Sequence, residues 1–103
     1  QVDLGFAGRY AEGHSVHRAI AALRPGDSVN LVADGDRLVL RDLAGRPVGR
    51  LARKYRPMDG YRLVDVRVSA ITVRRNDANP EYAEMVKTDR WEVVVPELVY
   101  EPE

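Results

Sequence analysis

Short apolar stretches with a period of two, each followed by turn residues, dominate the chain from residue 28 onward. Alternation of apolar and polar residues is typical of a β-strand with one buried face. Asp34-Gly35 lies between two such stretches, and Asp-Gly is a strong signal for a two-residue hairpin turn. We therefore expect strands at residues 28–33, 37–43 and 48–52 to form a meander.

The longest strand is expected at residues 61–74, where the apolar pattern changes phase. Even positions carry the apolar residues first and odd positions carry them at the end: Val64, Val66, Val68 and Ala70, then Ile71 and Val73. Such a switch implies a β-bulge or a bend, which is how a barrel strand turns a corner. A last strand at residues 91–100 contains Pro96, which predicts a sheet edge or a bulge. We expect Trp91 in the core.

The first part of the chain predicts one strand and one helix. Residues 2–10 alternate in polarity, and glycines within this stretch suggest a bulge or a close backbone approach. A helix at residues 15–23 is expected, with Ser15 as its N-cap. Its buried face would consist of residues at helical spacing, namely Val16, Ala19, Ile20 and Leu23.

These elements predict a mainly β fold, a small closed or partly open β-barrel of five to six strands with one or two short helices. We expect a basic loop at residues 53–60, another loop at residues 76–80 and one helical turn at residues 81–86. The 103 residues make one domain, 1–103. The chain begins at Gln1 without an initiator Met, so it is either processed or a fragment of a longer protein, and we interpret it as a fragment because Val2, Leu4 and Phe6 already alternate like a strand.

Composition restricts the setting of the protein and the chemistry open to it. The chain has no cysteine, so it forms no disulfide and no thiolate metal site. No apolar run approaches the roughly 18 residues that span a membrane. We therefore expect a cytoplasmic protein without a membrane partner.

A zero net charge conceals a strong asymmetry along the chain. Residues 1–36 carry a net charge of −2, residues 37–75 carry +8, and residues 76–103 carry −6. Arginine supplies 14 of the 16 basic residues, and its planar fork suits phosphate contact. Clustered basic charge indicates phosphate binding. The alternative is that the three segments fold together and neutralise one another.

The sequence contains no pattern that indicates catalysis. His14 and His17 are three residues apart, but no carboxylate lies at a recognisable ligand spacing, so we expect no metal site. Asp34-Gly35-Asp36 is explained by the hairpin without calcium. No serine lies in a nucleophile motif, and no glycine-rich phosphate loop precedes a helix. We therefore expect no catalytic residues and no cofactor.

Basic and aromatic residues lie together in two places, at the end of the first predicted strand and around residues 46–56. Single-stranded nucleic acid is bound by aromatic rings that stack on bases beside arginines that neutralise phosphates. The alternative is packing, because an aromatic side chain at a strand end more often closes the rim of a barrel. The candidate nucleic-acid-binding residues are Arg9, Tyr10, Arg46, Arg50, Arg53, Lys54, Tyr55 and Arg56.

Several segments resemble known families. The opening Ala7-Gly8-Arg9-Tyr10, the turn Arg24-Pro25-Gly26-Asp27 and the run from Asp42 to Arg53, with Gly-x-Pro-Val-Gly-x-Leu at its centre, resemble the HIRAN family. The segment Asp89 to Glu97 is similar to the C-terminal region of bacterial RecQ-type ATP-dependent DNA helicases. HIRAN domains are small β-barrels attached to helicases and chromatin remodellers, and some bind the 3′ end of single-stranded DNA.

The resemblance implies a non-catalytic DNA-binding accessory domain of an ATP-dependent helicase whose motor lies elsewhere in the full chain. It implies that Arg9 and Tyr10 hold a nucleotide and that Arg50 and Arg53 face phosphates. The family's Asn-Pro-x-Asp segment has no counterpart at residues 32–36, so the implied role is DNA binding in general. One alternative is a protein-interaction or structural domain that docks on the motor by its acidic end, and another is a small hydrolase or transferase.

Overall fold

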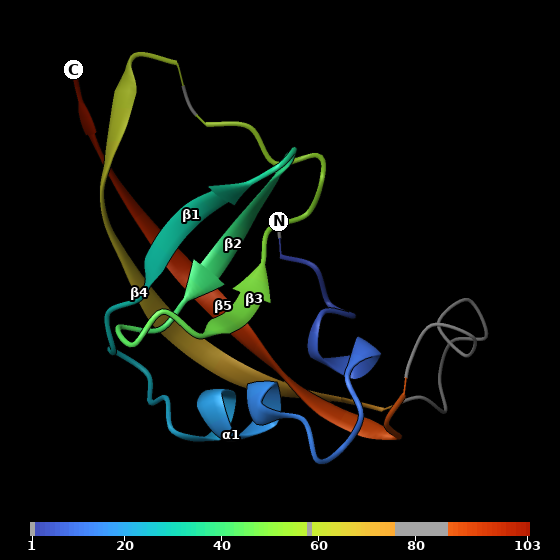
Figure 1. The fold of residues 1–103 in the computed structure, drawn as a ribbon. Coiled ribbons are helices and arrows are strands. Elements are labelled where there is room, and N and C mark those ends of the chain that lie inside the picture. Colours follow the sequence, from blue (N-terminus) through green and yellow to red (C-terminus); the bar gives the residue numbers. More distant parts are fainter. Residues whose placement is uncertain (1, 58, 76–86) are drawn as a thin grey trace.

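The computed structural model describes residues 2–57, 59–75 and 87–103. Over these residues the mainly β fold class is confirmed, with the strands in two antiparallel sheets (Figure 1). One sheet has the order β1-β2-β3 and the other pairs β4 with β5. The strands are β1 (Asn30–Asp34), β2 (Arg37–Arg41), β3 (Pro47–Arg50), β4 (Tyr61–Arg75) and β5 (Arg90–Pro102). The predicted loop at 76–80 and helical turn at 81–86 lie outside the described residues.

The predicted meander is confirmed, with strand ends shifted by at most two residues. In the first hairpin Asp34 pairs with Arg37, and Gly35 has φ +61°, the left-handed conformation that this tight turn requires. The second turn runs from Asp42 to Arg46, which is why β2 ends at Arg41, two residues earlier than predicted. Its Asp42 side chain is buried and holds the turn by hydrogen bonds.

Strands β4 and β5 form a long ribbon with two register shifts, one between Leu63 and Asp65 and one between Val68 and Ala70. The second shift is the predicted bulge. The first was not predicted, and it moves Val64 to the exposed face, so the expected burial of Val64 beside Val66 is wrong. Pro96 pairs with Val68 beside the second shift, as its missing N–H led us to expect.

The predicted first strand at residues 2–10 is wrong. Only Val2 makes a ladder contact, an isolated bridge to Leu51. The Asp3 carboxylate then accepts the backbone N–H of Gly5 at 3.0 Å, and this local hydrogen bond turns the chain out of the extended conformation. A short 3₁₀ helix, η1 (Ala7–Arg9), follows.

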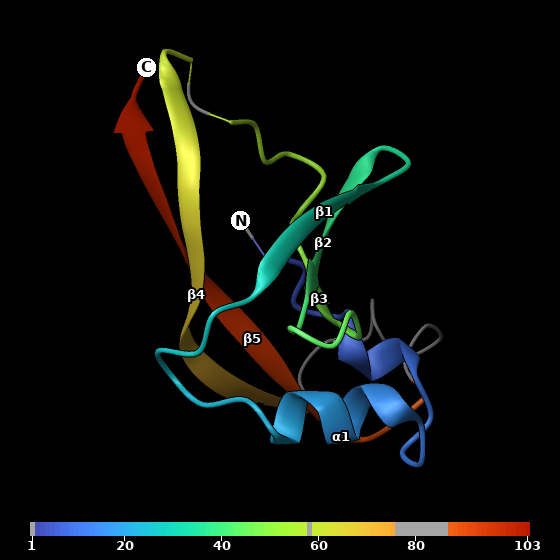
Figure 2. The same cartoon turned by 60° about the vertical axis from the view of Figure 1, so that its left-hand side comes forward.

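One α-helix, α1 (Ser15–Ala21), is present in the predicted region and ends two residues early. Its predicted N-cap is wrong by one residue, because Nδ1 of His14 accepts the Val16 N–H at 3.0 Å. The buried face is confirmed at Val16, Ala19 and Ile20. Figure 2 shows α1 across one end of both sheets, where it contacts β3 and β5.

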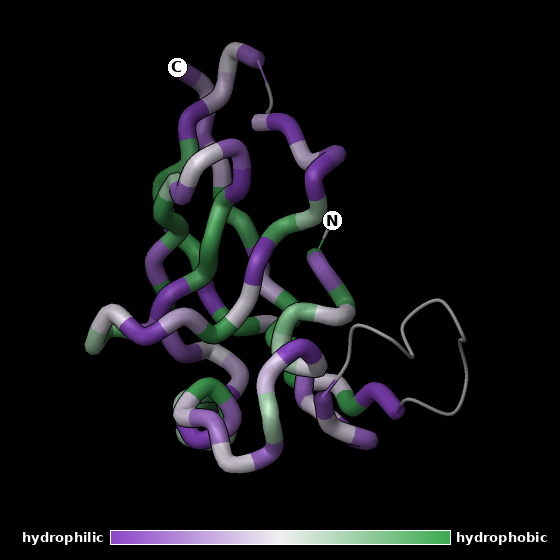
Figure 3. Tube along the Cα trace, turned by 45° about the vertical axis from the view of Figure 1, so that its right-hand side comes forward, coloured by the Kyte–Doolittle hydropathy of each residue, from purple (hydrophilic) through white to green (hydrophobic). Residues whose placement is uncertain are grey.

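Backbone hydrogen bonds join the two sheets through the segment that precedes β1. Gly26 N–H donates to the Val68 carbonyl at 2.7 Å, and Val29 N–H donates to the Val66 carbonyl at 3.0 Å. Hydrophobic segments follow the strands, while hydrophilic residues dominate the connecting loops (Figure 3). None of the described helices is long and apolar enough to cross a membrane.

Trp91 anchors the core against the N-terminal segment, and its predicted burial is confirmed. Its indole Nε1 donates to the Leu4 carbonyl at 2.8 Å. Gly8 packs on the indole so closely that a Cβ there would lie 2.8 Å from the ring. The predicted close approach in this stretch is therefore found at Gly8, with a side chain as the partner.

We expect Gly8→Ala to destabilise the fold by about 1–3 kcal/mol, because the added methyl overlaps the buried indole. Chemical denaturation monitored by Trp91 fluorescence measures this. Gly13→Ala is the matched control, since a Cβ at Gly13 meets no atom within 4 Å. Equal stability of the Gly8 and Gly13 variants would contradict the tight packing.

Candidate nucleic-acid interface

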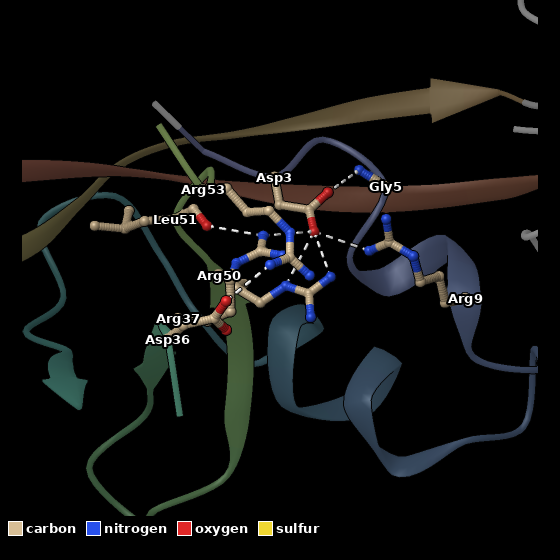
Figure 4. Close-up of polar contacts among 8 residues, drawn as sticks. All are labelled: Asp3, Gly5, Arg9, Asp36, Arg37, Arg50, Leu51 and Arg53. Atoms are coloured by element: carbon tan, nitrogen blue, oxygen red, sulfur yellow. Dashed lines mark hydrogen bonds and ion pairs between the residues drawn. The ribbon is translucent and has the colours of Figure 1, made fainter. Parts of the chain in front are cut away.

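Three arginines converge on one oxygen of Asp3 (Figure 4). Asp3 Oδ2 accepts Arg9 Nη1 at 2.8 Å, Arg37 Nη2 at 3.4 Å, and Arg50 Nε and Nη2 at 3.0 and 2.6 Å. The other oxygen, Oδ1, is taken by the Gly5 N–H. One carboxylate thus fixes side chains from η1, β2 and β3 at a single point.

A fourth arginine lies beside this group. Arg53 follows β3, and its Nη1 donates to Asp36 Oδ2 at 2.9 Å across the end of the first hairpin. Both partners of this ion pair are largely exposed. We refer to the four residues together as the arginine cluster, which consists of Arg9, Arg37, Arg50 and Arg53.

The positive charge of the arginine cluster exceeds the negative charge of Asp3 and Asp36, the two carboxylates that contact it. Arg53 and Asp36 balance each other, whereas Asp3 faces three guanidinium groups. Two positive charges are therefore uncompensated around Asp3. Positive charge held at fixed positions with partial access to solvent attracts phosphate groups.

Arg37 is the deepest member of the arginine cluster. Its side chain is 12% exposed and donates to the Leu51 carbonyl at 3.0 Å, while its buried Nε meets no acceptor among the described residues. Burial lowers the pKa of Arg37, as does the charge of Arg50, and Asp3 opposes both. Arginine nevertheless remains charged at neutral pH because its ordinary pKa is so high.

Hydrogen bonds keep Asp3 ionised. Burial raises the pKa of Asp3, but hydrogen bonds from Arg50, Arg9 and the Gly5 N–H outweigh this effect and leave the pKa below its usual value. The carboxylate is therefore a permanent anion at neutral pH. It can hold the arginines in place over the whole physiological range.

Arg46 lies apart from the arginine cluster, and it stabilises a turn. Its Nε donates to Asp42 Oδ2 at 2.6 Å, and its backbone N–H donates to Asp42 Oδ1 at 2.8 Å. Burial raises the pKa of Asp42, but these bonds and that of the Ala44 N–H outweigh this effect, so the pKa lies below its usual value. The Arg46 side chain is still half exposed, with Asp42 holding one edge.

Tyr10 is half-buried and packs against the core. Its ring makes an edge contact with Phe6 at 5.5 Å between centroids and a tilted contact with His14 at 4.5 Å. Tyr10 and Arg46 also line one small pocket with Pro47. The Tyr10 ring therefore lies beside Arg46 and is only partly exposed for stacking on a base.

The remaining candidates lie in the loop after β3. Arg56 Nη1 donates to the backbone carbonyls of Arg53 and Tyr55, both at 2.8 Å. Tyr55 is half-buried, and Lys54 is exposed. These side chains extend the basic surface beyond Arg53 along the loop.

Sequence reasoning missed two residues of this site, Asp3 and Arg37. Arg37 lies outside the dense basic run of residues 46–56, and its partners come from residues distant in the sequence. Asp3 offered one signal, since it is a carboxylate between two apolar residues at the start of the chain. That signal alone does not identify its partners.

The described residues contain no group of three or more His, Asp or Glu side chains arranged to hold a metal ion. His17 Nε2 lies 3.1 Å from the Tyr10 carbonyl, and His14 caps α1, so both histidines have structural partners. Comparisons of the sequence with protein-family models, with curated proteins and with solved structures found no match.

We expect Asp3→Asn to lower the free energy of unfolding at pH 7 by roughly 3 kcal/mol, because it leaves three partly buried cations unpaired. The folded-state pKa of Asp3 is depressed, so its contribution is fully present above the unfolded value of about 3.9 and is lost as pH falls through the lower folded pKa. The difference between wild type and variant should therefore shrink below about pH 4.

Chemical denaturation at pH 7 and at pH 3 tests this expectation. Asp36→Asn is the control, since its exposed ion pair contributes little to stability. A loss in Asp3→Asn that is the same at both pH values would refute the assigned role of the ionised carboxylate.

Proposed function

We propose that this chain is a non-catalytic DNA-binding domain that contacts single-stranded or junction DNA through the arginine cluster and the basic loop after β3. The observation that carries the proposal is the convergence of three guanidinium groups on one carboxylate. A single arginine would neutralise Asp3. The excess charge is therefore available to an anion from outside the chain.

The chemistry of the arginine cluster suits phosphate. Guanidinium groups bind phosphate oxygens through paired N–H donors, and several such groups can follow a backbone. Lys54 and Arg56 lie next along the chain and would add contacts to neighbouring phosphates. Tyr55, between them in the sequence, is the candidate for stacking on a base.

The accessory role beside a helicase motor rests on the resemblance to HIRAN and RecQ-type sequences. In that setting the motor of the same chain would bind ATP, and this domain would need no cofactor of its own. We also propose a partly open barrel, supported by the backbone bonds of Gly26 and Val29 to β4 and by the bridge between Val2 and Leu51. A cytoplasmic location belongs to the same proposal.

A second candidate function is docking on the motor domains. The end of the β4–β5 ribbon near the C-terminus extends away from α1 (Figure 2), and Tyr61 and Val64 are exposed there. Glu101 in this region is paired with Arg62. Docking through this end would leave the arginine cluster open to DNA, so the two functions are compatible.

We expect the domain to bind a fluorescein-labelled oligothymidylate at low salt with an affinity that falls steeply as salt rises. Neutralisation of four or five phosphates gives a log–log slope of about −3 for single strands. Fluorescence anisotropy at 50 and 200 mM NaCl measures it. An absence of binding at low salt would remove the DNA-binding function.

Arg53→Glu should weaken this binding and make the slope less negative by about 0.7, the contribution of one single-strand phosphate contact. Arg62→Glu is the matched control, because Arg62 is also an exposed, ion-paired arginine but lies on the β4–β5 ribbon. Anisotropy titrations of both variants make the comparison. Equal losses would indicate an effect of overall charge without a defined surface.

A further inference from the structure

We propose that Asp3 positions Arg9 and Arg50 as a clamp for one phosphate group of the nucleic acid. The inference rests on the DNA-binding function proposed above. It assigns to Asp3 a positioning role and to the two arginines a shared ligand, one phosphodiester oxygen pair. Arg37, the most buried of the three, would add positive charge without touching the ligand.

The two arginines keep donors beyond those that hold Asp3. A guanidinium has five N–H donors in a planar fork. Arg50 uses its Nε and one Nη on Asp3, and Arg9 uses one Nη. Each group can therefore bind the carboxylate with one edge and a phosphate oxygen with another.

Relative exposure places the carboxylate behind its partners. The side chains of Arg9 and Arg50 are 30% and 25% exposed, whereas that of Asp3 is 12% exposed. An anion arriving from solvent meets the guanidinium groups first. It need not displace the carboxylate that orients them.

Several contacts fix this geometry before any ligand binds. The Asp3 backbone N–H donates to the Arg50 carbonyl at 2.7 Å, and the Gly5 N–H holds the second carboxylate oxygen. The Arg50 guanidinium also lies 5.9 Å from the centroid of the Phe6 ring, a cation–π contact. A site held in this way loses little conformational entropy on binding, which strengthens affinity.

Arg37 explains why the site needs a carboxylate at all. Its charge is almost buried, and it lies against the same Asp3 oxygen as Arg9 and Arg50. Without the anion, mutual repulsion would drive the two exposed arginines apart. Asp3 therefore makes a close group of cations possible while it cancels only one of three charges.

The positioning role and simple electrostatics predict opposite results for Asp3→Asn. Overall charge alone predicts tighter DNA binding, because the variant loses a negative charge. Loss of the clamp predicts weaker binding, by roughly tenfold for one charge-assisted contact. We expect the weaker binding, measured by anisotropy with labelled oligothymidylate at fixed salt, with far-UV circular dichroism to establish that the variant is folded.

Asp36→Asn is the control for charge, since it also removes one carboxylate that contacts the arginine cluster but leaves Asp3 intact. It should bind as tightly as wild type or more tightly. If Asp3→Asn also binds as tightly as wild type, the positioning role is overturned while the DNA-binding function stands. If wild type itself does not bind, both proposals fail.

Arg9→Lys tests the clamp should the Asp3 variant fail to fold. Lysine keeps the charge, but a single ammonium cannot present two edges to the carboxylate and the phosphate. Affinity should again fall roughly tenfold. Arg18→Lys, an exposed substitution on α1, should leave affinity unchanged. Wild-type affinity in Arg9→Lys would overturn the clamp.

Discussion

The Asp3 carboxylate is the electrostatic centre on which this structure depends. Its Oδ2 atom joins arginines that lie 6, 34 and 47 residues away in the sequence, and so ties η1, β2 and β3 to the start of the chain. These contacts bring like charges together, one of them nearly buried. Because burial of an unpaired charge is expensive, the carboxylate and its partners must form as a unit. The turn at Gly5 that points Asp3 inward is therefore part of the fold and of the candidate site at once.

The same N-terminal segment also completes the hydrophobic core. Leu4 accepts the indole N–H of Trp91, Phe6 is buried, and Gly8 lies flat against the indole. These contacts fasten residues 4–8 to β5, while Val2 and Asp3 fasten the preceding residues to the end of β3. The segment thus bridges the two sheets. The packing of residues 4–8 against β5 therefore helps to hold Asp3 in place for its contacts with the arginines.

Much of the fold could be predicted from periodicity and turn chemistry, and the failures share a cause. The strands of the meander, the two long strands β4 and β5 taken singly, and the bulge after Val68 follow from local patterns. Residues 2–10 alternate like a strand, but a side-chain hydrogen bond of Asp3 and packing on Trp91 override that pattern. The candidate site divides in the same way. Arg50 and Arg53 stood out in the basic run, whereas Asp3 and Arg37 enter through contacts between distant residues, which one sequence does not reveal.

The ratio of arginines to carboxylates separates the Asp3 site from the other ion pairs in the described part of the chain. Arg46 with Asp42, Arg53 with Asp36, Arg62 with Glu101 and Arg67 with Asp65 are pairs of one cation with one anion. Each of these pairs is neutral in itself. At Asp3 the ratio is three to one, and the two additional cations add repulsion that a purely structural bridge would avoid. An arrangement that costs stability in the free protein is characteristic of a functional site. The proposed phosphate ligand would supply the negative charge that this arrangement lacks.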